Sequence, residues 1–344
     1  MHAAPAGESS GARPRSPAPA RSGTQSDRRT ERVLGALAAG VLGLIALMTI
    51  TVFAKAWPSF SHNGLTGWFQ SGGDVDQQLR EMLTSGTQGG HPTYHLRAWP
   101  LLWGTILTTG LAVLIGIVFS TFAAIFIVEF APAPVRRVIE PIVRLLGGVP
   151  SVVYGLIGIL AIAPWVNHHL LSESRKSSVE YLVQLAGSNL STATLILTVM
   201  ITPIMVAIVS SSLAAVPGPW TEGSAALGVN RWRTIWRISL RTARPAIIAA
   251  AVLATARALG EAIMLSMVSG GRGFAANPID GITFLFEPVR PLAATIVQNS
   301  EALSAPSLGR TLYAMAAVLM VSAALLSLAG WAAKQPLKRY GIRA

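Results

Sequence analysis

The chain alternates between long apolar runs and shorter polar segments. Six runs carry few charges and reach the length that a helix needs to cross a bilayer, about 20 residues for a hydrocarbon core of roughly 30 Å. They cover residues 33–54, 100–128, 142–166, 192–216, 246–268 and 309–333. This pattern predicts an all-α, polytopic membrane protein with six transmembrane helices.

The composition favours the same class. Hydrophobic residues make up 51% of the chain and charged residues only 12%, whereas soluble domains carry about 25% charged residues. The net charge of +12 is spread between the apolar runs, which argues against a nucleic-acid-binding domain because such domains gather their basic residues on one face.

Few residues offer metal-binding or catalytic chemistry. The absence of cysteine excludes disulfides and thiol catalysis, and no serine–histidine–aspartate or paired-carboxylate set lies on one predicted membrane face. Five histidines fall singly in predicted outer loops, at positions 62, 91, 95, 168 and 169. We therefore expect no metal site, no cofactor and no enzyme.

The basic residues predict the orientation, because cytoplasmic loops carry an excess of lysine and arginine. A cytoplasmic N-terminus places 18 of these residues inside and 8 outside, so we expect both termini in the cytoplasm of a bacterial cell. Residues 1–32 and 334–344 are predicted tails, the first disordered, and residues 57–97 form an outer loop. The first run is predicted to be an anchor, with cleavage near Ala54-Lys55-Ala56 as the alternative.

The cytoplasmic loop 217–245 predicts two short helices. Glu222 is placed near the start of the first helix, where an acid suits the positive dipole end, and Gly228 is a helix stop. Asn230 is a good N-cap for the second helix.

That second helix is predicted to be amphipathic. Trp232, Trp236 and Leu240 recur every four residues, and arginines recur one position later at 233, 237 and 241. An aromatic face beside a basic face favours a helix that lies on the membrane surface.

The fifth run contains Arg257 and Glu261, four residues apart. On a continuous helix over 246–268, Arg257 lies roughly 16 Å from either end and Glu261 about 6 Å beyond it on the same face. A charge at that depth is costly, so the pair must face protein or a water-filled path. One interpretation is a structural ion pair, although such pairs contribute little net stability. The other is an anion site, because arginine donates two parallel hydrogen bonds to an oxyanion.

The third run contains the sequence GGVPS, residues 147–151. Proline and the residue before it disfavour a regular helix, and broken helices at membrane depth line cavities or packed protein. Ser151 and exposed amides are therefore candidates to contact a passing anion, and a packing kink is the alternative.

Three motifs resemble a known family. Glu222, Gly228 and Ile238-Ser239-Leu240 have the spacing of the EAA loop of ABC importer permeases, with Gly223-Ser224 in place of Ala-Ala and Arg241 in place of proline. Residues 147–159 and 257–263 resemble permeases of the phosphate-specific (Pst) importer, as do Gly104-Thr105 and 129–132. Features of the first outer loop, Pro58-Ser59 and Gly64-Leu65, resemble the C-type subunit.

The resemblance covers about 97–333 and implies a type-I ABC importer permease. It implies that Glu222, Gly228, Ile238 and Leu240 belong to the surface that couples to a cytoplasmic ATPase, and that Arg257 and Glu261 serve transport. The implied partners are a second, A-type permease subunit, two ATPase subunits, an extracytoplasmic phosphate-binding protein and membrane lipid.

ATP binding by this chain itself is not expected, because it contains no G-x-x-x-x-G-K-[ST] phosphate loop. The alternatives are an ABC permease for molybdate or sulfate, an anion channel without a motor, and a membrane enzyme that acts on lipid phosphates. The last would need an interfacial nucleophile or metal cluster, which the sequence does not offer.

Overall fold

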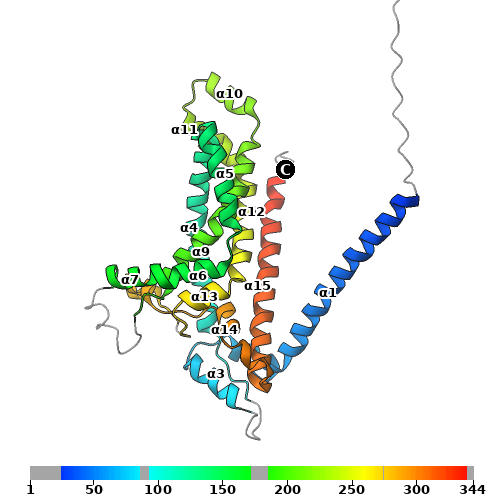
Figure 1. The fold of residues 1–344 in the computed structure, drawn as a ribbon, viewed down its shortest axis with the longest axis vertical. Coiled ribbons are helices and arrows are strands. Elements are labelled where there is room, and N and C mark those ends of the chain that lie inside the picture. Colours follow the sequence, from blue (N-terminus) through cyan, green and yellow to red (C-terminus); the bar gives the residue numbers. More distant parts are fainter. Residues whose placement is uncertain (1–24, 86–92, 172–184, 274, 339–344) are drawn as a thin grey trace, which may run out of the picture. The chain divides into compact units, whose positions relative to one another are not determined.

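A computed structural model describes residues 25–85, 93–171, 185–273 and 275–338 (Figure 1). The regular structure within these ranges is helical, and Gly270 and Val289 form an isolated parallel bridge. The longer α-helices are α1 (Gln25–Asn63), α4 (Trp99–Ile125), α5 (Ala133–Gly147), α9 (Leu190–Ala214), α12 (Leu240–Leu259) and α15 (Pro306–Lys338). The shorter ones are α2 (Leu65–Trp68), α3 (Val75–Thr84), α6 (Ser151–Ile157), α7 (Ala163–His169), α10 (Gly218–Ala226), α11 (Arg231–Thr234), α13 (Ile263–Val268) and α14 (Leu292–Gln298). Three π-helical segments are η1 (Phe126–Phe130), η2 (Gly158–Ile162) and η3 (Ile235–Ser239), and two 3₁₀ segments are η4 (Pro278–Phe286) and η5 (Ser300–Ser304).

Among the described residues, six helical stretches are long and apolar enough to cross a membrane, which confirms the predicted number. They are Arg28–Asn63, Trp99–Phe130, Ser151–His169, Leu190–Ala214, Arg231–Leu259 and Pro306–Ala332. The fifth stretch differs most from its predicted bounds, and the apolar runs predicted as the third and fifth spans each contain a break in the helix.

The chain ends of the described part are more helical than predicted. Helix α1 begins at Gln25, so residues 25–32 are helical and do not belong to a disordered tail. Helix α15 continues to Lys338 through five residues of the predicted C-terminal tail. Residues 1–24 and 339–344 lie outside the described residues.

The chain divides at Thr51 into two units, Met1–Thr51 and Val52–Ala344. In the described part of the first unit, the apolar side chains of α1 are exposed; Leu34, Leu37 and Leu47 are each about 60% exposed. Exposed leucines along a span are compatible with lipid or a neighbouring subunit, since both are apolar.

Helix α9 lies at the centre of the larger unit. Two thirds of its most apolar window is buried, against 33% or less for the other spans. It packs against α4, α5 and α12 (Figure 1), and its Leu197, Ile201 and Met205 are fully buried. Because α9 is apolar on all sides, it is suited to this largely buried position, in which Leu195 and Val199 remain about half exposed.

Helix α4 presents a stripe of small residues to this centre. Gly104, Thr108, Ala112, Gly116, Ser120 and Ala124 recur every fourth position and are buried. A Cβ on Gly116 would meet Met205 Sδ at 3.4 Å and Ile201 at 3.6 Å. Small residues at this spacing let two helix backbones approach closely in a membrane, and bulky residues such as Leu114 and Phe119 point outward.

A second apolar cluster lies at the end of the larger unit where α3 is found. Helix α1 continues through Pro58 into residues predicted to be a loop, and the indole of Trp68 donates to Ser59 Oγ at 3.2 Å. Ser59 Oγ in turn lies 3.3 Å from Thr311 Oγ1 of α15. The predicted outer loop is therefore an ordered cap in its described part.

Candidate functional site

The fifth span is broken just after Arg257. Helix α12 ends at Leu259 and α13 begins at Ile263, so the prediction of one continuous helix over 246–268 is wrong. Gly260 takes the C-cap position and donates to Ala256 O at 3.4 Å. Arg257 thus lies in the last turn of α12, and the longer helix α15 packs against α12 (Figure 1).

The break separates the two charges that were predicted to form a pair. Glu261 follows the end of α12, and its Oε1 accepts a hydrogen bond from Met264 N of α13 at 3.4 Å. Within the described residues Arg257 has no acidic partner within 4.0 Å, and its side chain is exposed in the single chain. The guanidinium is therefore available to a ligand, which an ion-paired arginine is not.

The third apolar run is broken as well. Helix α5 ends at Gly147 and α6 begins at Ser151, so residues 142–147 belong to a separate helix, and the crossing stretch starts at Ser151. The Tyr154 hydroxyl donates across the break to Leu146 O at 2.9 Å. The same carbonyl also accepts from Val149 N at 3.3 Å, and the tyrosine hydroxyl takes the place of the N–H that Pro150, four residues on, does not have.

The two broken regions meet. A Cβ on Gly155 of α6 would lie 2.7 Å from Met267 Sδ and 3.3 Å from Met264 Cα of α13, so a side chain here would require Met267 to move and the two helices to separate slightly. Helix α13, which begins six residues after Arg257, packs against α6. Half-buried Ser151 precedes Tyr154 by three residues and shares its face of α6. The structure therefore brings the break that follows Arg257 close to α6, the helix that carries Ser151.

A separate feature projects at the opposite end from α3, where α10 forms a tip (Figure 1). Gly228 has φ of 72° and its amide donates to Ala225 O at 2.9 Å, which confirms its predicted role as a helix stop. Helix α10 begins at Gly218, so Glu222 is its fifth residue and lies beyond the first turn. Its carboxylate nevertheless reaches back to the start of the helix, because a Cβ on Gly218 would lie 3.5 Å from Glu222 Oε1, in agreement with the expected position near the positive dipole end. The exposed tip carries Leu227, which is 84% exposed.

The base of the tip differs from the predicted surface helix. Asn230 caps α11 through Trp232 N at 2.8 Å, as expected, but the helix then runs without interruption from Arg231 to Leu259 as part of a span. The π-helical turn η3 contains one more residue than an α-helical turn. Leu240 therefore does not lie on the same face as the two exposed tryptophans, and it is buried, with 7% exposed.

The coupling residues implied by the resemblance therefore occupy two places. Glu222 and Gly228 are exposed at the tip, whereas Ile238 is half-buried and Leu240 belongs to the central core. The pairing of Ser224 Oγ with Thr234 Oγ1, at 2.8 Å and buried, holds the tip to its base.

Two residues with structural roles at these places were not assigned by sequence reasoning. One is Tyr154, whose hydroxyl bridges the first break. The other is Glu129 in η1, which accepts from Ser239 Oγ at 3.4 Å and lies 3.9 Å from Arg231 Nη2. Both residues lie inside sequence motifs that were identified above. Their polarity, next to a helix break or a loop, was the signal that could have indicated their roles.

Six spans, helices interrupted within the bundle and an exposed helical tip define a multi-pass membrane protein of the kind used in transport, since discontinuous helices commonly form transporter binding sites. The model of the family described as "Binding-protein-dependent transport system inner membrane component" matches residues 116–334. The chain belongs to this family of ABC importer permeases.

Curated relatives are similar over most of the chain. The "Probable ABC transporter permease protein YqgH" of Bacillus subtilis is 32% identical over 75% of this chain and 78% of its own. The "Phosphate transport system permease protein PstC 1" of Mycobacterium bovis is 32% identical, covering 67% and 70%. PstC of Mesorhizobium japonicum is 30% identical and covers 76% of both chains.

A solved structure supports the fold. One chain of a bacterial alginate ABC transporter, solved with a periplasmic protein that binds an alginate pentasaccharide, has a TM-score of 0.55 at 14% identity. The match covers 91% of this chain and 97% of that one. The predicted type-I ABC importer permease fold is thereby confirmed.

Proposed function

We propose that this chain is the C-type permease subunit of an ATP-driven phosphate importer. The observation that carries the proposal is the exposed, unpaired guanidinium of Arg257 at a helix break inside the bundle. Arginine suits phosphate because its planar fork donates two charge-assisted hydrogen bonds. The names of the PstC relatives support phosphate as the substrate.

The proposed path runs along the meeting of α6 with the α12–α13 break. Arg257 contacts the anion there, and the Ser151 hydroxyl and free amides near the α5–α6 break complete a weak site. The site has to be weak because a tightly held ion would not leave. Glu261 holds the start of α13 in place, rather than holding the guanidinium.

The proposed assembly contains this chain, an A-type permease, two cytoplasmic ATPase subunits and an extracytoplasmic phosphate-binding protein. The α10 tip docks on an ATPase, so α10 and both termini are cytoplasmic and α3 faces outside. This orientation agrees with the excess of basic residues on the tip side.

The test of function is transport by the reconstituted assembly. We expect ATP-dependent uptake of radiolabelled phosphate into proteoliposomes, with no uptake when a non-hydrolysable nucleotide replaces ATP. A hundredfold excess of sulfate or molybdate should leave uptake unchanged. Inhibition by either anion would instead identify a permease for that oxyanion, and ATP-independent flux would identify a channel.

Replacing Tyr154 by phenylalanine should slow uptake without abolishing it. The change removes one hydrogen bond across the α5–α6 break, worth about 1 kcal/mol, so we expect uptake to fall about two- to tenfold. Initial rates in proteoliposomes measure this.

The matched control is Tyr313→Phe, because the hydroxyl of Tyr313 receives only a long contact of 3.4 Å from Lys55 Nζ. An unchanged rate for Tyr154→Phe would show that the bridge across the break does not shape the path.

A further inference from the structure

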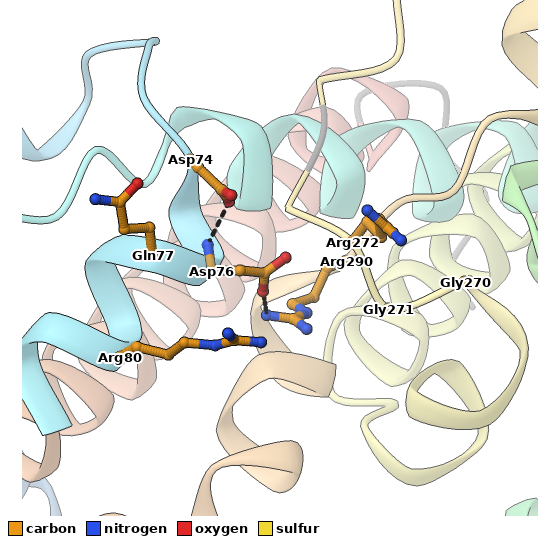
Figure 2. A pocket seen from close by; sticks show the side chains of 8 residues that line it. All are labelled: Asp74, Asp76, Gln77, Arg80, Gly270, Gly271, Arg272 and Arg290. Carbon is orange, nitrogen blue, oxygen red and sulfur yellow. Dashed lines mark hydrogen bonds and ion pairs between the residues drawn. The ribbon is translucent and has the colours of Figure 1, made fainter. Parts of the chain in front are cut away.

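A cavity of about 580 Å³ lies at the end of the larger unit opposite α10, between α3 and the chain that follows α13 (Figure 2). Its lining includes three arginines, Arg80, Arg272 and Arg290. They come from three separate segments of the chain, and Figure 2 shows their guanidinium groups gathered at one place. Two acids, Asp74 and Asp76, also line the cavity.

Both acids are already engaged. Asp76 pairs with Arg290, and Asp74 caps α3 by accepting from Asp76 N at 2.9 Å. Arg80 and Arg272 are exposed, and neither has an acidic partner among the described residues. The three arginines outnumber the two acids in the lining, so the cavity has a formal net charge of +1, and Arg80 and Arg272 are not held in an ion pair.

Arg290 adds an unsatisfied donor. Its side chain is only 14% exposed, and its Nε is buried without a hydrogen-bond partner. A buried donor of this kind is costly to leave unpaired. An oxyanion in the cavity would compensate that cost, because its several oxygens accept hydrogen bonds from more than one guanidinium.

The cavity lies next to the proposed path. Helix α13 starts beside the Arg257 break and ends at Val268, four residues before Arg272. Six helical residues span only about 9 Å, so one short helix links the two arginine sites. Gly270 and Gly271, with φ of 90° and 66°, turn the chain between α13 and Arg272.

We propose that this cavity is a second, outer oxyanion site, which receives free phosphate before the ion reaches Arg257. The assignment rests on the proposed phosphate import and adds an arrival site to it. Arg80 and Arg272 bind the ion, and Arg290 contributes through its free donor. Asp76 keeps the site weak, because its negative charge opposes the bound anion, and a weak site releases the ion onward.

The test is phosphate binding to the purified permease–ATPase assembly without its binding protein. In an Arg257→Leu background, equilibrium dialysis with radiolabelled phosphate measures the outer site alone. We expect Arg80→Gln together with Arg272→Gln to weaken this binding at least tenfold. Arg97→Gln is the matched control, since Arg97 is an exposed arginine at the same end that does not line the cavity, and it should leave binding unchanged.

A second measurement identifies the source of the oxyanion. If the double variant keeps full phosphate binding but docks the binding protein more weakly, the arginines receive carboxylates of that protein and the proposal is overturned. Absence of phosphate binding in the Arg257→Leu assembly would also overturn it. Failure of the proposed function has a different signature, namely no ATP-driven phosphate uptake by the unaltered assembly, whatever the dialysis shows.

Discussion

Replacing Arg257 with leucine should reduce ATP-driven phosphate uptake at least a hundredfold. Two charge-assisted hydrogen bonds are lost, each worth about 1.5–3 kcal/mol, and the leucine side chain has no hydrogen-bond donor for an oxyanion. Arg257→Lys keeps the charge but not the planar fork, so we expect a loss of about tenfold. Initial uptake rates in proteoliposomes measure both variants.

Glu261→Gln separates this mechanism from an ion-pair role. The amide oxygen of glutamine still accepts from Met264 N, so most uptake should remain. If Arg257 and Glu261 worked as a pair, the two variants would lose uptake equally. Arg97→Leu controls for the loss of an exposed arginine elsewhere, and all variants must first be shown to assemble with their ATPase.

The second large effect concerns the tip. Leu227→Asp should release the ATPase from the permease, because a leucine that is 84% exposed in the single chain is buried against the ATPase in the proposed assembly. Losing that burial costs about 1.5–3 kcal/mol, and a buried, unpaired carboxylate adds to the cost. We expect ATPase binding to weaken at least a hundredfold and uptake to cease.

Co-purification of the ATPase in detergent measures this effect. The control is Leu83→Asp, which places the same charge on a 43% exposed leucine of α3, at the other end of the larger unit. Retention of the ATPase by Leu227→Asp would place the docking surface elsewhere.

The number and approximate position of the spans followed from hydropathy alone, because a crossing helix needs a long apolar run. The breaks were harder to predict. Proline in GGVPS signalled the first break, whereas the fifth run stayed apolar beyond the end of its helix. Gly260 was the available signal for that end, since glycine favours helix termini.

The predicted four-residue periodicity was wrong where the α-helix gives way to a π-helical turn. A four-residue repeat placed Leu240 on one face with Trp232 and Trp236, and the π-turn at Ile235–Ser239 buried it instead. Such turns have no reliable sequence signature. The small residues that recur every fourth position from Gly104 to Ala124 are different, because a small residue at each fourth position is itself a signal of close helix packing.

The unbroken helix from Arg231 to Leu259 has a mechanical consequence. Its 29 residues extend roughly 43 Å, with the ATPase-docking tip attached at one end and the arginine of the break at the other. Tilting such a lever arm by about ten degrees displaces its far end by roughly 7 Å, more than one helical turn of rise. In the proposed assembly, closure of the ATPase at the tip would therefore move the Arg257 end of this helix directly.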